Sequence, residues 1–171
     1  MAHQHHSGTG GDLPLRAKIL TVSDGVIGGT RDDKSGPLLE AHLADAGWEV
    51  VERAATEDGE LPVADALTTL ADGFHGLIVT TGGTGFGPRD RTPEGTTAVL
   101  DRQAPGLAEA MRLVSPLGRL SRAVAGTRGT TLIVNTPGSS KGCIETLDAV
   151  LDVLAHAVRL LVDNSDAHPG G

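Results

Sequence analysis

The chain has 171 residues, of which 39% are hydrophobic and only 2% aromatic, so it can form one domain around an aliphatic core. Its formal net charge of -8 argues against nucleic acid as a main partner, because binding to a phosphate backbone requires clustered lysine and arginine side chains. The single cysteine, Cys143, excludes an intrachain disulfide and favours a reduced, cytoplasmic setting.

The two ends of the chain differ in composition from its centre. We expect residues 1–14, which begin with a histidine-containing stretch, to form a disordered N-terminal tail. We expect residues 165–171 to form a frayed C-terminus. No linker or internal repeat divides the rest, so residues 15–164 are predicted to be a single domain.

Strands and helices alternate between these ends. In chain order, the patterns predict a strand over residues 17–22, a helix over 38–46, a strand over 49–54, a helix over 61–70, a strand over 76–81, helices over 92–100 and 106–114, and a strand over 131–135. Residues 123–130 could pair with the last strand as a hairpin. A long final helix carries Ile144, Leu147, Leu151, Leu154, Val158 and Leu161 on one face. Its apolar segment contains Asp152, His156 and Arg159, so we do not expect a membrane span.

This alternation predicts an α/β fold, a three-layer structure with a mostly parallel sheet and helices on both faces. In such folds, ligands bind beyond the carboxyl ends of the strands. A suggestive loop follows each predicted strand: Ser23 and Asp24 after the first, Glu57 and Asp58 after the second, residues 81–90 after the third and residues 137–141 after the fourth. We therefore expect four loops to converge at one edge of the sheet.

The most informative loop is the glycine-rich turn over residues 80–94. Its backbone N–H groups and the helix that begins near Thr92, the predicted cap, form an arrangement that binds phosphate. The glycine spacing fits neither a dinucleotide fingerprint nor a Walker A loop. Asp90 in this turn could bind Mg²⁺ beside phosphates. Alternatively, the turn is a tight connection without a ligand, and Asp90 is a second cap or a partner of Arg89 or Arg91.

The other loops offer further polar groups. The acidic turn with Glu57 and Asp58 either caps the next helix or places a second carboxylate opposite Asp90. Ser35, just before Pro37, is typical of a capped helix start and a second candidate anion site. The loop with Ser139 and Lys141 either holds an oxyanion or is a capped turn.

An ordered set of segments carries a family pattern: residues 21–24, 33–37, 81–85 with 89–94, 105–112, 120–122 with 125–129, and 135–139. With these segments the chain resembles the MoaB/Mog family of molybdenum cofactor biosynthesis. The resemblance implies an α/β fold, commonly a homotrimer, that binds molybdopterin, a pterin dithiolene with a terminal phosphate. It further implies that AMP is transferred from Mg-ATP to that phosphate and pyrophosphate is released.

The resemblance also assigns candidate site residues. It implies that Asp90 lies at the magnesium and catalytic centre and that residues 82–85 hold phosphate. The candidate substrate- and phosphate-binding residues are Ser23, Asp24, Ser35, Gly82, Gly83, Thr84, Gly85, Thr92, Pro137, Gly138, Ser139 and Lys141.

The acidic turn departs from the family pattern. Active members carry Pro-Asp-Asp or Pro-Asp-Glu there, and the first Asp is catalytic, whereas this chain has Thr56, Glu57 and Asp58. Either Glu57 substitutes with a longer reach, or Asp58 shifts into place. The alternatives to an adenylyltransferase are a non-catalytic molybdopterin-binding carrier or scaffold, and a CinA-like enzyme that hydrolyses nucleotide pyrophosphate bonds.

Overall fold

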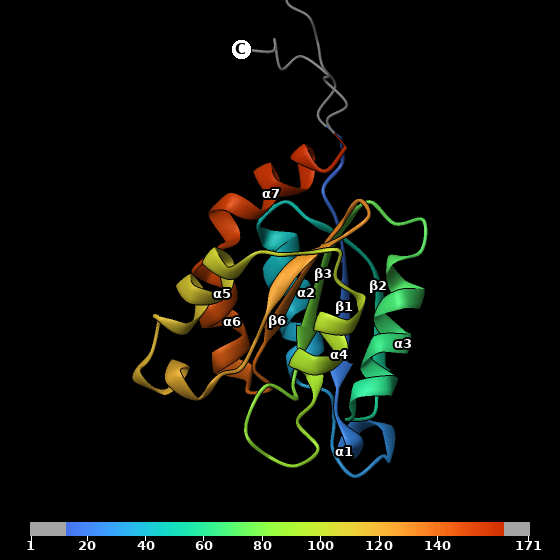
Figure 1. Cartoon of the computed structure of the whole chain (residues 1–171), viewed down its shortest axis with the longest axis vertical. Helices are drawn as coiled ribbons and strands as arrows, with labels where there is room; N and C mark the ends of the chain where they lie inside the picture. Colours follow the sequence, from blue (N-terminus) through green and yellow to red (C-terminus); the bar gives the residue numbers. More distant parts are fainter. Residues whose placement is uncertain (1–12, 163–171) are drawn as a thin grey trace, which may run out of the picture.

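The computed structural model describes residues 13–162, which form a six-stranded, mostly parallel sheet with helices on both faces (Figure 1). The strand order is β2 (Glu49–Thr56), β1 (Arg16–Val22), β3 (Gly76–Thr81), β6 (Thr131–Thr136), β5 (Ala125–Arg128) and β4 (Arg102–Gln103). The first four strands in this order are parallel, while β5 and β4 are added in antiparallel pairing. The predicted fold class is therefore confirmed.

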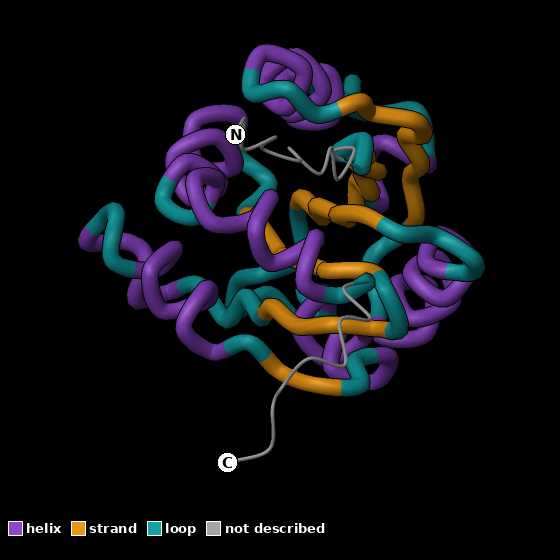
Figure 2. The backbone as a smooth tube through the Cα atoms, turned by 90° about the horizontal axis from the view of Figure 1, so that it is seen from above, coloured by secondary structure: helices purple, strands orange, loops and turns teal. Residues whose placement is uncertain are grey.

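Side chains of the central strands alternate between two separate apolar layers, as the pleat of a sheet requires. Ile19 and Leu77 point into a layer shared with α2 (Ser35–Asp45), α5 (Pro105–Arg112), α6 (Ser140–Asp148) and α7 (Leu151–Leu160). Leu20 and Ile78 point the other way, against α3 (Glu60–Ala71) and α4 (Thr92–Val99). Figure 2 shows these helices on either side of the strands. Burial of both faces explains why β3 is a continuous apolar run.

The predicted strands are confirmed within two residues, and residues 125–128 form the predicted hairpin with β6. Three short elements were not predicted: α1 (Asp24–Ile27), the edge strand β4 and the 3₁₀ helix η1 (Pro116–Leu120). The expected tails over residues 1–14 and 165–171 lie outside the described residues, except for residues 13 and 14, which belong to no helix or strand. In the described part of the chain, no helix is long and apolar enough to cross a membrane.

The prediction of one long final helix is wrong. The chain leaves helical geometry at Val150, where φ is -125° and ψ is -8°, and α6 and α7 are separate helices. The Val150 side chain is only 1% exposed, so the break itself lies in the core. The apolar stripe continues across the break, which is why the sequence pattern did not reveal it.

Two predicted helix caps also need correction. Thr92 is the first residue of α4 rather than its cap, and its hydroxyl donates to the carbonyl of Gly82 at 2.9 Å. Ser35 is the first residue of α2, and the N–H of Gly36 is instead capped by Asp33 Oδ1 at 2.9 Å. The Thr92 hydroxyl therefore ties the start of α4 to the loop after β3, while the Ser35 hydroxyl accepts from Thr81 at the end of β3.

Candidate active site

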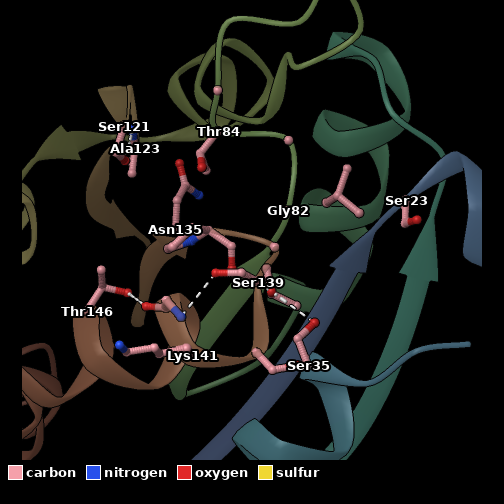
Figure 3. Close-up of a pocket in the computed structure, with 18 of the residues that line it drawn as sticks. Ser23, Ser35, Gly82, Thr84, Ser121, Ala123, Asn135, Ser139, Lys141 and Thr146 are labelled. Atoms are coloured by element: carbon pink, nitrogen blue, oxygen red, sulfur yellow. Dashed lines mark hydrogen bonds between the residues drawn. The ribbon is translucent and has the colours of Figure 1, made fainter. Parts of the chain in front are cut away.

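A cavity of about 970 Å³ lies beyond the carboxyl ends of β1, β3 and β6, and is the candidate active site. It is lined by twelve of the predicted site residues: Ser23, Ser35, Asp58, Gly82, Gly83, Thr84, Gly85, Asp90, Pro137, Gly138, Ser139 and Lys141. Figure 3 shows how the labelled side chains from these separate segments surround one space. Asp24, Glu57 and Thr92 do not line this cavity.

The glycine loop, residues 82–91 between β3 and α4, begins with a backbone that only glycine tolerates well. Gly82 and Gly83 have φ values of +102° and +69°. A Cβ at Gly82 would lie 2.3 Å from the Val22 carbonyl oxygen, and one at Gly83 would lie 2.3 Å from Thr92 Oγ1. The N–H of Thr92 also donates to the Gly83 carbonyl at 3.0 Å. The loop is thus pressed against β1 on one side and the start of α4 on the other.

The carboxylate of Asp90 lies against this loop and not against the side chain of either neighbouring arginine. Its Oδ2 accepts a hydrogen bond from the Gly87 N–H at 2.9 Å, and a Cβ at Gly85 would lie only 3.0 Å from the same oxygen. The neighbouring arginines have other partners: Arg89 pairs with Asp24 at 2.6 Å and Arg91 with Glu94 at 3.8 Å. The alternative of an ion pair between Asp90 and one of these arginines is therefore wrong, and the carboxylate faces the cavity.

Asp58, rather than Glu57, brings the second carboxylate to the cavity. Asp58 Oδ2 accepts from the Asp24 N–H at 2.9 Å, and the Asp58 N–H donates to Asp24 Oδ1 at 3.1 Å. This reciprocal pair turns Asp58 toward the glycine loop, where a Cβ at Gly83 would lie 3.3 Å from Asp58 Oδ1. Glu57 lines a different groove, between β2 and α3.

Arg89 completes the support of Asp58. Its guanidinium donates to both Asp24 carboxylate oxygens, at 2.6 and 3.1 Å, and to the Asp58 carbonyl at 2.9 Å. The predicted substrate-binding residue Asp24 thus contacts Asp58 and Arg89 and holds the acidic turn in place. A planar, two-pronged guanidinium suits this geometry better than an ammonium group.

The electrostatics of the two aspartates differ. The hydrogen bond from the Arg89 side chain holds the pKa of Asp24 below its ordinary value of 3.8. Burial raises the pKa of Asp58 above 3.8, and the negative charges of Asp24 and Asp90 add to this effect, although the Asp24 N–H opposes it. A carboxylate such as Asp58, whose ionisation is made more costly by a neighbouring negative charge in the same cavity, is suited to binding a cation.

The starts of α2 and α6 form the opposite wall. Thr81 Oγ1 lies 3.1 Å from Ser35 Oγ and 2.9 Å from the Pro137 carbonyl, so β3 links both helix starts. Ser139 is the confirmed cap of α6, since its hydroxyl accepts from the Gly142 N–H at 3.1 Å. The Lys141 side chain is exposed and lies 3.7 Å from Glu145. These two helix starts add positive electrostatic potential to the cavity.

Several lining residues were not predicted from the sequence. They lie in residues 31–34, in residues 114–123 with the 3₁₀ helix η1 (Pro116–Leu120), and at Asn135, Glu145 and Thr146. Asn135 had a usable signal, because a fully buried amide in an apolar strand needs partners. Its side chain donates to Thr80 and Thr96 at 3.0 Å and accepts from the Val124 N–H at 3.1 Å. The loop residues carried no such signal.

The side chains that line the cavity indicate which kind of metal site it could form. Within residues 13–162, no group of three or more histidine, cysteine, aspartate or glutamate side chains is arranged to hold a metal ion. Asp58 and Asp90 are a pair of carboxylates, and Mg²⁺ is typically bound by one or two carboxylates together with substrate phosphates and waters. The residues present therefore fit Mg²⁺ that arrives with a nucleotide, and do not fit an all-protein metal cage.

Comparisons with known proteins place these features among relatives. A family model described as "Probable molybdopterin binding domain" matches residues 18–156. The chain is 38% identical over 152 residues to the molybdopterin adenylyltransferase of Escherichia coli (strain K12), and the match covers 84% of this chain and 77% of that protein. It is 34% identical over 152 residues to the molybdenum cofactor synthesis protein cinnamon of Drosophila melanogaster; that match covers 85% of this chain but only 25% of cinnamon.

A solved structure shows the same similarity in three dimensions. The molybdopterin biosynthesis enzyme MoaB from Thermus thermophilus matches with a TM-score of 0.81 and 48% sequence identity. The match covers 86% of this chain and 96% of that one.

Proposed function

Since the chain belongs to the family of probable molybdopterin binding domains, as its sequence predicted, we propose that it is a molybdopterin adenylyltransferase. In this reaction, the terminal phosphate of molybdopterin attacks the α-phosphate of ATP, an anhydride bond forms, and pyrophosphate leaves. The observation that carries the proposal is that Asp58 and Asp90 line one cavity with the glycine loop at the carboxyl ends of the parallel strands.

The proposed chemistry is mainly a matter of positioning. Adenylyl transfer joins two anionic groups, so it requires charge neutralisation and in-line alignment, and does not require a strong base. The Gly82 N–H already donates to the Thr136 carbonyl at 3.1 Å, so the backbone N–H groups of residues 83–85 would orient phosphate oxygens, with added potential from the helix starts at Ser35 and Ser139. Lys141, on the cavity wall, would attract the anionic substrates.

Asp58 and Asp90 would hold Mg²⁺, which supplies charge neutralisation to the phosphate oxygens when it is bound. Asp24 and Arg89 keep Asp58 in place, and the Gly87 N–H fixes one oxygen of Asp90. In this proposal, Asp58 supplies the catalytic carboxylate of the acidic turn, and Glu57 does not. We also propose, from the resemblance, that the protein acts in the cytoplasm as a homotrimer.

The test is incubation of the purified chain with molybdopterin, ATP and Mg²⁺, followed by detection of adenylylated molybdopterin and pyrophosphate. Formation of both products supports the proposal. Binding of the pterin without either product would instead indicate a carrier or scaffold. Cleavage of a nucleotide pyrophosphate bond in the absence of pterin would indicate a CinA-like activity.

A further inference from the structure

Arg122 does not line the cavity. Its side chain contacts the glycine loop at two points and α4 at one. Its Nε donates to the Gly85 carbonyl at 2.7 Å and its Nη2 to the Asp90 carbonyl at 2.6 Å. Its Nη1 donates to Glu94 Oε1 in the first turn of α4. One guanidinium therefore spans the segment between Gly85 and Glu94, which contains Asp90.

The backbone that carries Arg122 is itself fixed. The Arg122 N–H donates to the Thr84 carbonyl at 2.9 Å, and Arg112 of α5 donates to the Ala123 carbonyl at 2.8 Å. Ser121 and Ala123, on either side of Arg122, line the cavity (Figure 3). Arg122 thus connects the cavity wall after η1 to the loop that presents Asp90.

This connection matters because residues 86–89 are exposed and have little apolar packing to hold them. Phe86 is 70% exposed, and its ring lies 6.0 Å from the Arg122 guanidinium. Within the loop, Asp90 makes two hydrogen bonds with Gly87. The Asp90 N–H donates to the Gly87 carbonyl, and the Asp90 carboxylate accepts from the Gly87 N–H. The Arg89 side chain ties this segment to Asp24 and Asp58. The Arg122 contacts tie it to the opposite wall, and they are the ones made to the backbone of Gly85 and of Asp90 itself.

From these contacts, and on the basis of the proposed function, we propose that Arg122 is a positioning residue that holds the Asp90 carboxylate at the reacting phosphates. It does not touch the substrates and acts through the carbonyls of Gly85 and Asp90. Lysine cannot replace it, because a single ammonium group lacks the planar fork that reaches two carbonyls and a carboxylate together.

The first test compares Arg122→Lys with Arg128→Lys. Arg128 makes a similar contact, from Nη1 to the Val99 carbonyl at 2.9 Å, but lies away from the cavity, so it is a matched control. We expect Arg122→Lys to lower kcat by about a hundredfold, with each KM changed less than about threefold, because a small misplacement affects the transition state most. Arg128→Lys should keep wild-type kcat. An unchanged kcat in Arg122→Lys overturns the proposal.

The second test measures the loop without turnover. In hydrogen–deuterium exchange, we expect Arg122→Lys to accelerate exchange about tenfold or more in a peptide over residues 83–91, with no change in α6. Unchanged exchange in this peptide also overturns the proposal. If the wild-type protein makes no adenylylated product, the proposed function fails, while the exchange result still decides whether Arg122 holds the loop.

A third variant separates positioning from stability. Glu94 Oε2 is buried and has no hydrogen-bond partner within the described residues, so loss of Arg122 alone would leave a poorly partnered carboxylate. The double variant Arg122→Met with Glu94→Gln removes both charges. We expect it to unfold at a temperature close to wild type and still to lose kcat. Recovery of wild-type kcat in this folded double variant would contradict the proposal.

Discussion

At the scale of single residues, the site depends on which of two adjacent acids reaches the cavity. Asp58 is turned inward by its reciprocal hydrogen bonds with Asp24, whereas Glu57 faces the groove beside α3. The side-chain length of Glu57 is therefore irrelevant, because its backbone position directs it away from Asp90. The unusual Thr-Glu-Asp turn retains one carboxylate in the cavity.

This arrangement predicts opposite results for two adjacent substitutions. Asp58→Asn should lower the rate of adenylyl transfer by about a hundredfold or more, because it removes one of two charges proposed to hold Mg²⁺. Glu57→Gln should leave the rate within about twofold of wild type. Steady-state kinetics at saturating Mg²⁺ measures both. A larger loss in Glu57→Gln than in Asp58→Asn would show that the acids are assigned the wrong way round.

A second prediction concerns the ionisation of Asp58. Burial and the negative charges of Asp24 and Asp90 raise its pKa above 3.8, so Asp58 takes up a proton at higher pH than an ordinary aspartate. Since the ionised form is the one needed, the rate should fall as pH decreases through this raised pKa. Asp90→Asn removes a negative charge, so we expect the pKa of Asp58 to fall.

Carboxyl ¹³C NMR titration without Mg²⁺ measures this change directly. Asp65→Asn is a suitable control, because Asp65 is exposed and lies in the separate groove beside β2. The pKa of Asp58 should be the same in this control as in the wild type. An equal pKa in the Asp90→Asn variant would show that the two carboxylates are not electrostatically coupled.

At the scale of elements, the connection from β3 to α4 is the decisive one. Its glycines allow the backbone to pass between the Val22 carbonyl and Thr92, and the same lack of side chains leaves room for the Asp58 and Asp90 carboxylates. Close contact with Val22 of β1 and Thr92 of α4 thus determines the backbone of the loop. Glycine is required there for steric reasons, whether or not a ligand is present.

Two glycine substitutions separate backbone strain from steric contact. Gly73 and Gly83 have similar φ values, +61° and +69°, but a Cβ at Gly73 meets nothing within 4 Å. Gly73→Ala should therefore lower the free energy of unfolding by about 1 kcal/mol, the cost of left-handed backbone alone. Gly83→Ala should lower it by about 2 kcal/mol or more, because its Cβ would collide with Thr92.

Urea unfolding of both variants measures this difference. Equal losses would mean that the loop near Gly83 relaxes freely and is not pressed against α4. Adenylyl transfer should also fall in Gly83→Ala but not in Gly73→Ala, since only Gly83 lies at the cavity.

At the scale of the whole molecule, the sheet brings together groups that are far apart in the chain. The parallel order of β2, β1, β3 and β6 places four loops at one edge, so residues between Ser23 and Lys141 surround one cavity. The antiparallel strands β5 and β4 extend the sheet beyond β6. Arg122 lies in the segment of the chain that connects β4 to β5. The two apolar layers hold this arrangement from both faces.

The proposed homotrimer is also tested at this scale. Light scattering coupled to gel filtration should give a mass three times that of the 17.5 kDa chain. The mass should not change between dilute and concentrated samples if the assembly is stable. A mass equal to one chain at all concentrations would exclude the trimer.

The sequence by itself determined the fold class, the order of the longer strands and helices up to β6, and four of the loops that line the site. Local sequence patterns predict these features. The patterns are the apolar run of β3, the glycines after it, and the polar residues after each strand. The convergence of the four loops also followed, because parallel strands share one edge for their carboxyl ends.

Only the tertiary structure decided which groups face one another. The contact of Thr92 with Gly82 spans 10 residues, and the choice of Asp58 over Glu57 depends on Asp24, which lies 34 residues away in the chain. The same holds for Arg122, whose side-chain partners lie 28 to 37 residues away in the chain. Local patterns set the direction of the backbone, but side-chain partners across elements set the chemistry of the site, and those partners exist only once the sheet has formed.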